Sequence, residues 1–523
     1  MTGTNAPRVS PQGPGRYGPD ARTTHVWVPP TALPETCGAL ALGGARLVVM
    51  TATDERPLGR GFGLYYVFAR SSGDYVAVCA MLDPAHPSFP SVTPLVPAAH
   101  WYEREAKDLF GLDPQGHPDP RRLVLHPDWP HGVHPLRKDF AGSTRVPRVV
   151  HDDVTMTGVH GQGVIEIPVG PVHAGIIEPG HFRFGGVGEL VLDLEARLFY
   201  THRGIEKSVE GRSVERALVL AERICGVCSV SHAVAFSQAI ESLAGAQPTR
   251  RAHLVRSVFL ELERLYNHVG DLANLCAGAS LQLGLYQGGV LKERFQELNG
   301  NVGGHRYLFG IVTPGGVRRD LDPTARQTIA RTLDMLEPQF DGFVDGLLDT
   351  DSFMERLIGT GTLDHDLAVS LGAVGIAARA SGVARDVRHD HPYAAYGPGS
   401  VVPITRAEGD VRARMLVRID EARASFGLIR GFLRELAELA ADGLAVPLGA
   451  LEPERWALSA VESPRGENVH WVMTGRDGEL YRYRVRSASY NWALVPFAVV
   501  GNLLPDFPLI NKSFELCYAC LDR

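Results

Sequence analysis

The sequence predicts an α+β protein in two unequal parts, a small N-terminal α/β domain and a large, mainly helical domain with peripheral β-strands. Short β-like runs dominate residues 25–100, whereas stretches with apolar residues at helical spacing dominate after about residue 163. At 523 residues the chain is also longer than one ordinary hydrophobic core supports. We therefore expect two domains joined by a linker.

The composition is that of a globular protein, with 45% hydrophobic and 21% charged residues. No apolar run is long enough to cross a bilayer, and the N-terminus lacks the apolar core of a secretory signal. Residues 1–22 are rich in Pro, Gly and polar residues, so we expect a disordered lead there. A net charge of −7 argues against nucleic acid as the main partner. These features predict a cytoplasmic protein.

The N-terminal domain is expected at residues 23–145. Its clearest signal is a β-hairpin, in which Gly63–Phe68 and Tyr75–Ala80 flank Ser-Ser-Gly-Asp. A short amphipathic helix is expected at Trp101–Gly111, followed by an extended arm rich in Pro, His and Arg. The polar, Gly-rich residues 146–162 suit a linker.

The second domain is expected at residues 163–523. It opens with two β-like runs, at 163–169 and 181–193. Helices are expected at residues 213–224, 231–243, 250–276 and 409–441, and a strand pair at 468–489 with Asp477-Gly478 as its turn.

Four of the seven cysteines form two CxxC pairs at opposite ends of this domain, Cys225/Cys228 and Cys517/Cys520. Both thiolates of a CxxC can turn to one side of a tight loop, and four thiolates suit zinc, an iron–sulfur cluster or nickel. Structural zinc pairs usually lie about 15–20 residues apart, and a thioredoxin-like pair follows a strand, so neither alternative fits well. Cys37, Cys79 and Cys276 are expected to be buried small hydrophobes.

The residues around both pairs carry a specific resemblance. Arg223-Ile-Cys-Gly-Val-Cys-Ser-Val-Ser-His232 and Leu516-Cys-Tyr-Ala-Cys-Leu-Asp-Arg523 resemble the two signatures of [NiFe] hydrogenase large subunits, in the membrane-associated, formate-hydrogenlyase or hydrogenase-4 type. The resemblance implies that Cys225 and Cys517 are terminal nickel ligands. It implies that Cys228 and Cys520 bridge nickel to an iron carrying CO and cyanide, with magnesium as a further candidate ion.

Three further segments resemble parts of the same active site. Ile177-Glu-Pro-Gly-His181 implies that Glu178 relays protons, and Ser463-Pro-Arg-Gly-Glu467 implies that Arg465 lies above the open metal face. His232, Glu515 and Pro464 would lie just outside the ligands. Taken without the resemblance, Glu178 would be an ordinary loop carboxylate, Arg465 a surface ion pair and His232 a packing residue. Glu515-Leu516 departs from the Asp-Pro usual in the family and frees the local backbone.

The N-terminal domain resembles the C-type subunit of complex I in Glu103–Gly111 and His134–Phe140, which implies a docking element without a cofactor. His202–Lys207 and Arg379–Tyr393 resemble both hydrogenases and the D-type subunit of complex I. The chain would thus be a fusion of C-like and D-like units.

Electrons from H₂ must leave the chain, but it has no ferredoxin-type cysteine run and no dinucleotide fingerprint. We therefore expect an iron–sulfur small subunit as partner. The resemblance adds antiporter-like membrane subunits, a peripheral position on the inner face of the cell membrane, and hydrogenase maturation proteins.

Two other functions remain open. A complex-I-like module would bind quinone and no metal, but the D-type subunit of complex I lacks both cysteine pairs. A non-enzymatic scaffold would explain Glu515-Leu516 but not four cysteines. The sequence favours a hydrogenase that interconverts H₂ with protons and electrons.

Overall fold

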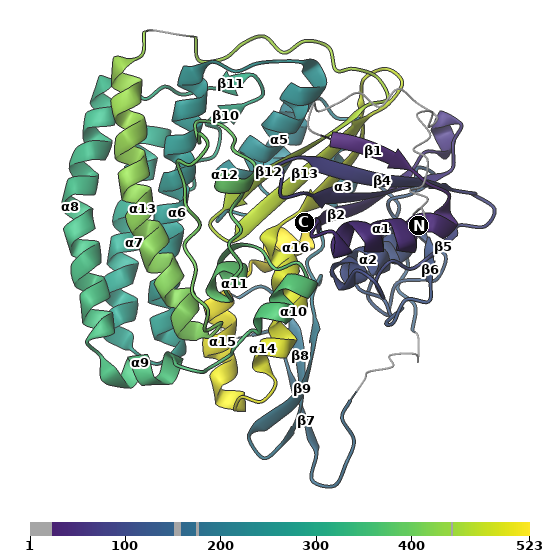
Figure 1. Cartoon of the computed structure of the whole chain (residues 1–523), viewed down its shortest axis with the longest axis horizontal. Coiled ribbons are helices and arrows are strands. Elements are labelled where there is room, and N and C mark those ends of the chain that lie inside the picture. The colour runs from purple at the N-terminus through teal and green to yellow at the C-terminus, as the bar shows by residue number, and fades with distance from the viewer. Residues whose placement is uncertain (1–22, 151–157, 174–176, 441–442) are drawn as a thin grey trace, which may run out of the picture.

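The computed structural model describes residues 23–150, 158–173, 177–440 and 443–523, and it has the mixed α+β architecture that the sequence predicts (Figure 1). The expected lead at 1–22 and part of the expected linker lie outside these residues.

A four-stranded sheet in the order β1-β4-β3-β2 organises the N-terminal part, with β1 parallel to β4 and the other pairs antiparallel. Its elements are β1 (Thr23–Trp27), α1 (Leu33–Leu42), β2 (Arg46–Asp54), β3 (Phe62–Ala69), β4 (Tyr75–Leu82), β5 (Ser88–Pro90), α2 (His100–Phe110) and β6 (Asp113–Gln115). The predicted β3–β4 hairpin and the predicted helix α2 are confirmed. The sequence did not reveal α1, because Pro34 and Gly38 weaken its helical pattern.

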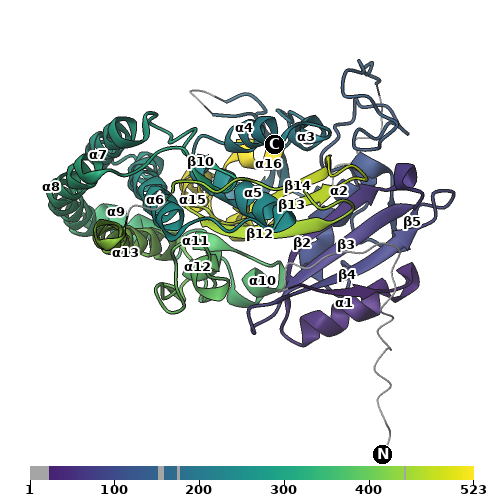
Figure 2. The ribbon, with the colours of Figure 1, turned by 90° about the horizontal axis from the view of Figure 1, so that it is seen from above.

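Four long helices lie side by side at one end of the molecule (Figures 1 and 2). They are α6 (Arg250–Gly278), α7 (Gln282–Gly303), α8 (Pro323–Leu348) and α13 (Val411–Glu438). Side-chain oxygens of Thr249, Asp322 and Asp410 accept hydrogen bonds from backbone amides in the first turns of α6, α8 and α13. The predictions of α6 and α13 are confirmed, whereas α7 and α8 were not predicted.

An antiparallel sheet of β12 (Trp456–Ser463), β13 (Gly466–Thr474) and β14 (Leu480–Arg486) lies between this bundle and the N-terminal sheet (Figure 2). The predicted strand pair is confirmed as β13 and β14. Helix α5 (Ser229–Ala244) packs on β12 and β13 and so brings the first cysteine pair against this sheet.

A second antiparallel sheet, β7 (Ile165–Val169), β8 (His181–Val187) and β9 (Leu190–Arg197), extends from the body in Figure 1. The run expected at 181–193 is two strands rather than one, because Gly188 turns the backbone with φ 60°. The remaining elements are α3 (Ile205–Val209), α4 (Val214–Glu222), β10 (Val312–Thr313), β11 (Gly316–Val317), α9 (Asp351–Leu357), α10 (His365–Ser370), α11 (Gly375–Ala380), α12 (Val387–Asp390), α14 (Val495–Val499), α15 (Phe507–Phe514) and α16 (Tyr518–Asp522).

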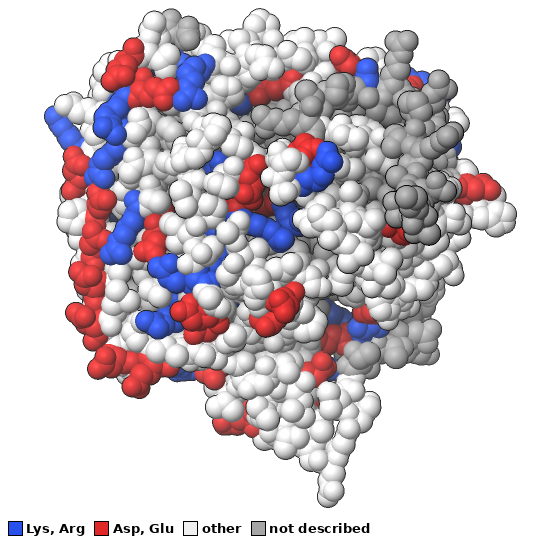
Figure 3. All heavy atoms as spheres, in the orientation of Figure 1, with Lys and Arg blue, Asp and Glu red and all other residues white. Residues whose placement is uncertain are grey.

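Acidic side chains follow the outer edge of the bundle along α8 (Figure 3). Asp334 and Glu337 pair with Arg430 of α13, and Asp341 pairs with Arg423. Such exposed ion pairs connect neighbouring helices, but each contributes little to the stability of the fold. Among the described residues, no helix combines the length and the apolar character needed to cross a lipid bilayer.

Candidate metal centre

The first cysteine pair lies in the short loop between α4 and α5. Helix α6 fixes this loop, because Tyr266 Oη donates to the Gly226 carbonyl at 3.0 Å and Asn267 Nδ2 donates to the Val227 carbonyl at 2.8 Å. The Val227 amide also donates to Cys225 Sγ at 3.3 Å. Bonds from α6 therefore fix the loop that carries the two thiols.

The second pair comes from the last residues of the chain. Helix α15 ends at Phe514, Glu515 adopts a left-handed conformation with φ 51°, and Cys517 immediately precedes α16. This reversal of the backbone turns Cys517 and Cys520 toward the first pair.

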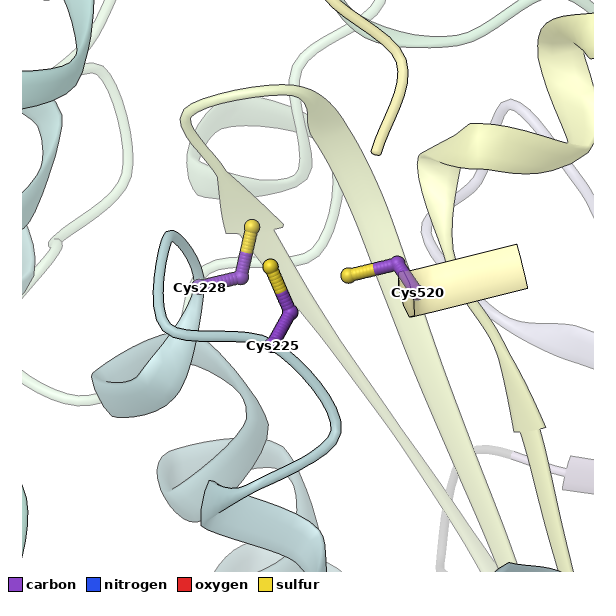
Figure 4. A group of neighbouring side chains, drawn as sticks. All are labelled: Cys225, Cys228 and Cys520. Atoms are coloured by element: carbon purple, nitrogen blue, oxygen red, sulfur yellow. The ribbon is translucent and has the colours of Figure 1, made fainter. Parts of the chain in front are cut away.

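Together the four Sγ atoms form what we call the thiol cluster. Cys225 Sγ and Cys517 Sγ lie 3.0 Å apart, and the sulfurs of Cys225, Cys228 and Cys520 all lie within 4.8 Å of one another. Figure 4 shows three of these side chains pointing toward one another, two from the loop before α5 and one from α16. None of the four is in a disulfide, and Cys225, Cys228 and Cys520 are almost fully buried. Cys37, Cys79 and Cys276 are buried elsewhere, as expected.

Crowding of the thiols splits their pKa values. A hydrogen bond from Cys225, together with one from Cys520, lowers the pKa of Cys228 to about 6 against the opposing effect of burial. Hydrogen bonding to Cys225 raises the pKa of Cys517 to about 12, and the pKa of Cys520 also rises well above its usual value. Like charges this close cannot all form alone, so four thiolates here need a cation.

Arg203 joins the two cysteine segments. Its guanidinium donates to the carbonyls of Arg223 at 3.0 Å and Ile224 at 2.8 Å, just before the first pair, and to the Ala519 carbonyl at 2.8 Å, between the second pair. A planar guanidinium with several donors suits this bridging position. In the sequence, Arg203 belongs to the segment His202–Lys207, which resembles both hydrogenases and the D-type subunit of complex I. Its bridging role between the two cysteine segments was not predicted.

Glu178 lies at the edge of the thiol cluster, with its side chain exposed in the isolated chain. Its Oε2 accepts a hydrogen bond from the Ala519 amide at 2.6 Å. Partial desolvation and the neighbouring Cys517 raise the pKa of Glu178, while the Ala519 amide opposes the change. The carboxyl group is therefore next to the sulfurs and also reachable from solvent.

Arg465 is buried beside Pro464 in the turn between β12 and β13. It forms an ion pair with Asp271 of α6 and lies 3.8 Å from a Glu515 oxygen. Burial raises the pKa of Glu515 to about 7. Arg465 is thus not the surface ion pair that the sequence left open, and Asp271 is a partner that the sequence did not reveal.

His232 is fully buried on α5, and its Nε2 lies 3.4 Å from Cys520 Sγ. Burial lowers its pKa to about 3, with a smaller effect of Arg203, so the ring is neutral. The structure therefore places all the predicted site residues in one region. Their roles as ligands or proton carriers remain predictions.

Comparisons with known proteins define the class. The sequence model of the nickel-dependent hydrogenases matches residues 203–277. The models of the 30 kDa and 49 kDa subunits of respiratory-chain NADH dehydrogenase match residues 26–146 and residues 289–445 and 442–523. The matches thus combine a hydrogenase segment with two complex I subunits in one chain.

Individual relatives narrow the class further. Formate hydrogenlyase subunit 5 of Escherichia coli is 37% identical over 92% of this chain and 85% of its own length, and hydrogenase-4 component G of the same organism is 36% identical over 91% and 84%. The chain belongs to this family of hydrogenase large subunits, which confirms the resemblance seen in the sequence. A solved structure of the membrane-bound sulfane sulfur reductase, an archaeal respiratory membrane complex, superposes with a TM-score of 0.64 at 27% identity, covering 69% of this chain and 99% of that one.

Proposed function

We propose that this chain is the catalytic large subunit of a [NiFe] hydrogenase that interconverts H₂ with two protons and two electrons. The observation that carries the proposal is the thiol cluster. Cys225 and Cys517 are 292 residues apart in the sequence, yet their Sγ atoms lie 3.0 Å from each other. A structural zinc site does not require such distant segments.

The donor set fits nickel and iron. Cys225, Cys228, Cys517 and Cys520 offer four soft sulfur ligands, and thiolates of this kind favour soft or borderline metals. We infer that Cys225 and Cys517 would hold nickel while Cys228 and Cys520 would bridge to iron. Among the described residues, Cys225, Cys228 and Cys520 are the one group of three or more His, Cys, Asp or Glu side chains close enough to hold an ion. Magnesium therefore remains a prediction without a ligand group.

When bound, the metal pair would supply the Lewis acidity that polarises H₂. Glu178, which accepts a hydrogen bond from the backbone amide of Ala519, would then carry the proton from a cysteine sulfur toward solvent. Arg465 would present a fixed positive charge to the open side or to a cyanide ligand on iron. Asp271 and Glu515 hold that guanidinium in place.

Two electrons per H₂ must leave through a partner. Four of the seven cysteines form the thiol cluster, and the other three are too few for a cluster of their own. We infer an iron–sulfur small subunit, in a complex that binds the membrane through antiporter-like subunits. Residues 23–145 would serve as a docking domain, 146–162 as a linker and 163–523 as the metal-binding domain.

Metal analysis of the complex purified from its native host tests the proposal. We expect about one nickel per chain, from the four-thiolate geometry. We also expect the complex to catalyse exchange between D₂ gas and solvent protons, which we call hydrogen–deuterium exchange. Cys517→Ser should lose both the nickel and the activity, because it removes one ligand. Cys276→Ser changes a buried cysteine of α6 outside the cluster and should keep both.

Zinc alone in the parent protein, or nickel and turnover surviving in Cys517→Ser, would contradict the proposal. The relatives also include the C/D subunit of NADH-quinone oxidoreductase from Phocaeicola vulgatus, at 30% identity over 77% of this chain. Quinone reduction without nickel would therefore favour the complex-I-like alternative.

A further inference from the structure

A single line of hydrogen bonds runs from the thiol cluster into the central sheet. His232 Nε2 lies 3.4 Å from Cys520 Sγ, and His232 Nδ1 lies 2.9 Å from His470 Nε2 on β13. His470 Nδ1 in turn lies 2.9 Å from Tyr483 Oη on β14. His232, His470 and Tyr483 are all fully buried, with no exposed surface.

Each imidazole in this line has a hydrogen-bond partner at both of its ring nitrogens. An imidazole that accepts a hydrogen bond at one nitrogen is neutral and carries its single N–H on the other nitrogen. The position of each N–H therefore follows from the nitrogen that accepts.

The buried hydroxyl fixes the direction of the line. Among the described residues, Tyr483 Oη has one hydrogen-bond partner, which is His470 Nδ1. A buried O–H group without an acceptor is costly. Tyr483 must then donate to Nδ1 of His470. This leaves the N–H of His470 on Nε2, where it donates to His232 Nδ1, and leaves the N–H of His232 on Nε2, facing Cys520. In the opposite direction the buried hydroxyl of Tyr483 would lack an acceptor.

We propose that His470 and Tyr483 are positioning residues that lock His232 in the Nε2–H tautomer, so that it donates a hydrogen bond to the Cys520 sulfur. The donated bond withdraws electron density from one sulfur of the cluster and holds it in place. The effect on a bound metal rests on the proposed function, but the tautomer itself does not, because it follows from the buried hydroxyl.

The tautomer can be measured in the full-length protein without metal. Magic-angle-spinning NMR on the ¹⁵N-histidine-labelled protein should show His232 and His470 as neutral Nε2–H rings. Assignment comes from the signals that disappear in His232→Gln and His470→Gln. In Tyr483→Phe the His470 Nδ1 signal should shift, because it loses its donor. A Nδ1–H ring at His232 in the parent protein would overturn the proposal.

A second measurement uses the metal-loaded complex. His470→Phe removes the donor to His232, so the sulfur should become a stronger electron donor and the infrared CO band of the iron should move to lower wavenumber. His470→Gln keeps an N–H donor and should restore the band. His391→Phe alters another buried ring, which stacks on Tyr75 and bonds the Gly73 carbonyl, and it should leave the band in place.

An unshifted CO band in folded, nickel-loaded His470→Phe would count against the proposal. A parent complex with neither nickel nor a CO band would instead refute the proposed function. The metal-free NMR measurement would then still decide the tautomer.

Discussion

Glu178 and Arg465 lie beside the same thiol cluster in opposite surroundings. Glu178 is accessible from solvent and makes one backbone hydrogen bond, whereas Arg465 is buried and paired with Asp271. A group that exchanges protons with the outside benefits from the first setting. A fixed charge benefits from the second, because low dielectric surroundings strengthen its field.

Glu178→Gln isolates the proton-carrying role. The amide oxygen can still accept the Ala519 hydrogen bond, but the side chain can no longer take up a proton. We expect hydrogen–deuterium exchange to fall by about 10²- to 10⁴-fold, with nickel content unchanged. Glu166→Gln, an exposed change on β7, serves as the control. Unchanged exchange in Glu178→Gln would remove this residue from the proton route.

The residues that the sequence revealed at this scale are those within short motifs, namely the four cysteines, Glu178, Arg465 and His232. Arg203, Asp271, His470 and Tyr483 escaped, for a physical reason. Arg203 donates its hydrogen bonds to backbone carbonyls, and every residue type has a backbone carbonyl, so the sequence does not indicate these partners. His470 lies 238 positions from His232, and only the folded sheet brings the two rings together.

Among the elements, α5 has an unusual N-terminus. Cys228 precedes it and offers no side-chain cap, but Glu263 of α6 accepts hydrogen bonds from the amides of Val230 at 2.6 Å and Ser231 at 3.1 Å. A carboxylate from a neighbouring helix thus replaces a local capping residue. The helix that carries the first cysteine pair is thereby tied to the bundle.

Glu263 should make stability depend on pH. Burial raises its pKa from 4.5 to about 7, so the folded state binds the proton more tightly than the unfolded state. Its contribution therefore becomes less favourable as pH rises from about 4.5 to about 7, by about 3 kcal/mol in all, and is constant above that range. Glu263→Gln does not titrate. The difference in thermal unfolding midpoint, parent minus variant, should therefore decrease between pH 5 and pH 8.

An exposed carboxyl group gives the matched control. Glu297→Gln on α7 lies on the surface, and its midpoint difference should not change across the same pH range. A midpoint difference for Glu263→Gln that is equally flat would show that burial does not shift this carboxyl group.

Sequence patterns predicted elements unevenly. Helices with a continuous apolar face, α6 and α13, were found to within a few residues. Helix α7 contains Gly284, Gly288, Gly289 and Gly300, and α8 contains Pro338, all of which lower helix propensity. Gly284 and Gly288 are needed because a Cβ there would lie within 3 Å of α6 side chains. Close helix packing thus obscured the helix signal.

The whole molecule is joined by a buried ion network. Glu105 of α2 pairs with Arg484 of β14 and with Arg523, and Glu206 of α3 lies 2.8 Å from Arg482 and from Arg523. These five residues connect the N-terminal sheet region, the central sheet and the segment bearing Cys520. None of these pairings follows from sequence, since each partner lies far away along the chain.

Glu105→Gln would remove one of the two buried carboxylates that Arg484 and Arg523 share. Breaking a buried ion pair in this way costs about 3–5 kcal/mol, so we expect a lower unfolding temperature and faster proteolysis of the N-terminal part. Glu35→Gln on the exposed face of α1 is the control. Equal stability of the two variants would show that the network does not hold the N-terminal part in place.

The thiol cluster also has a thermodynamic consequence. A metal bound by both cysteine pairs would tether positions 292 residues apart, and an unfolded chain with such a tether loses much of its freedom. In a chain-entropy treatment this restriction is worth on the order of 5 kcal/mol. Incompletely loaded preparations should therefore melt as two populations, and heat would remove the unloaded one first.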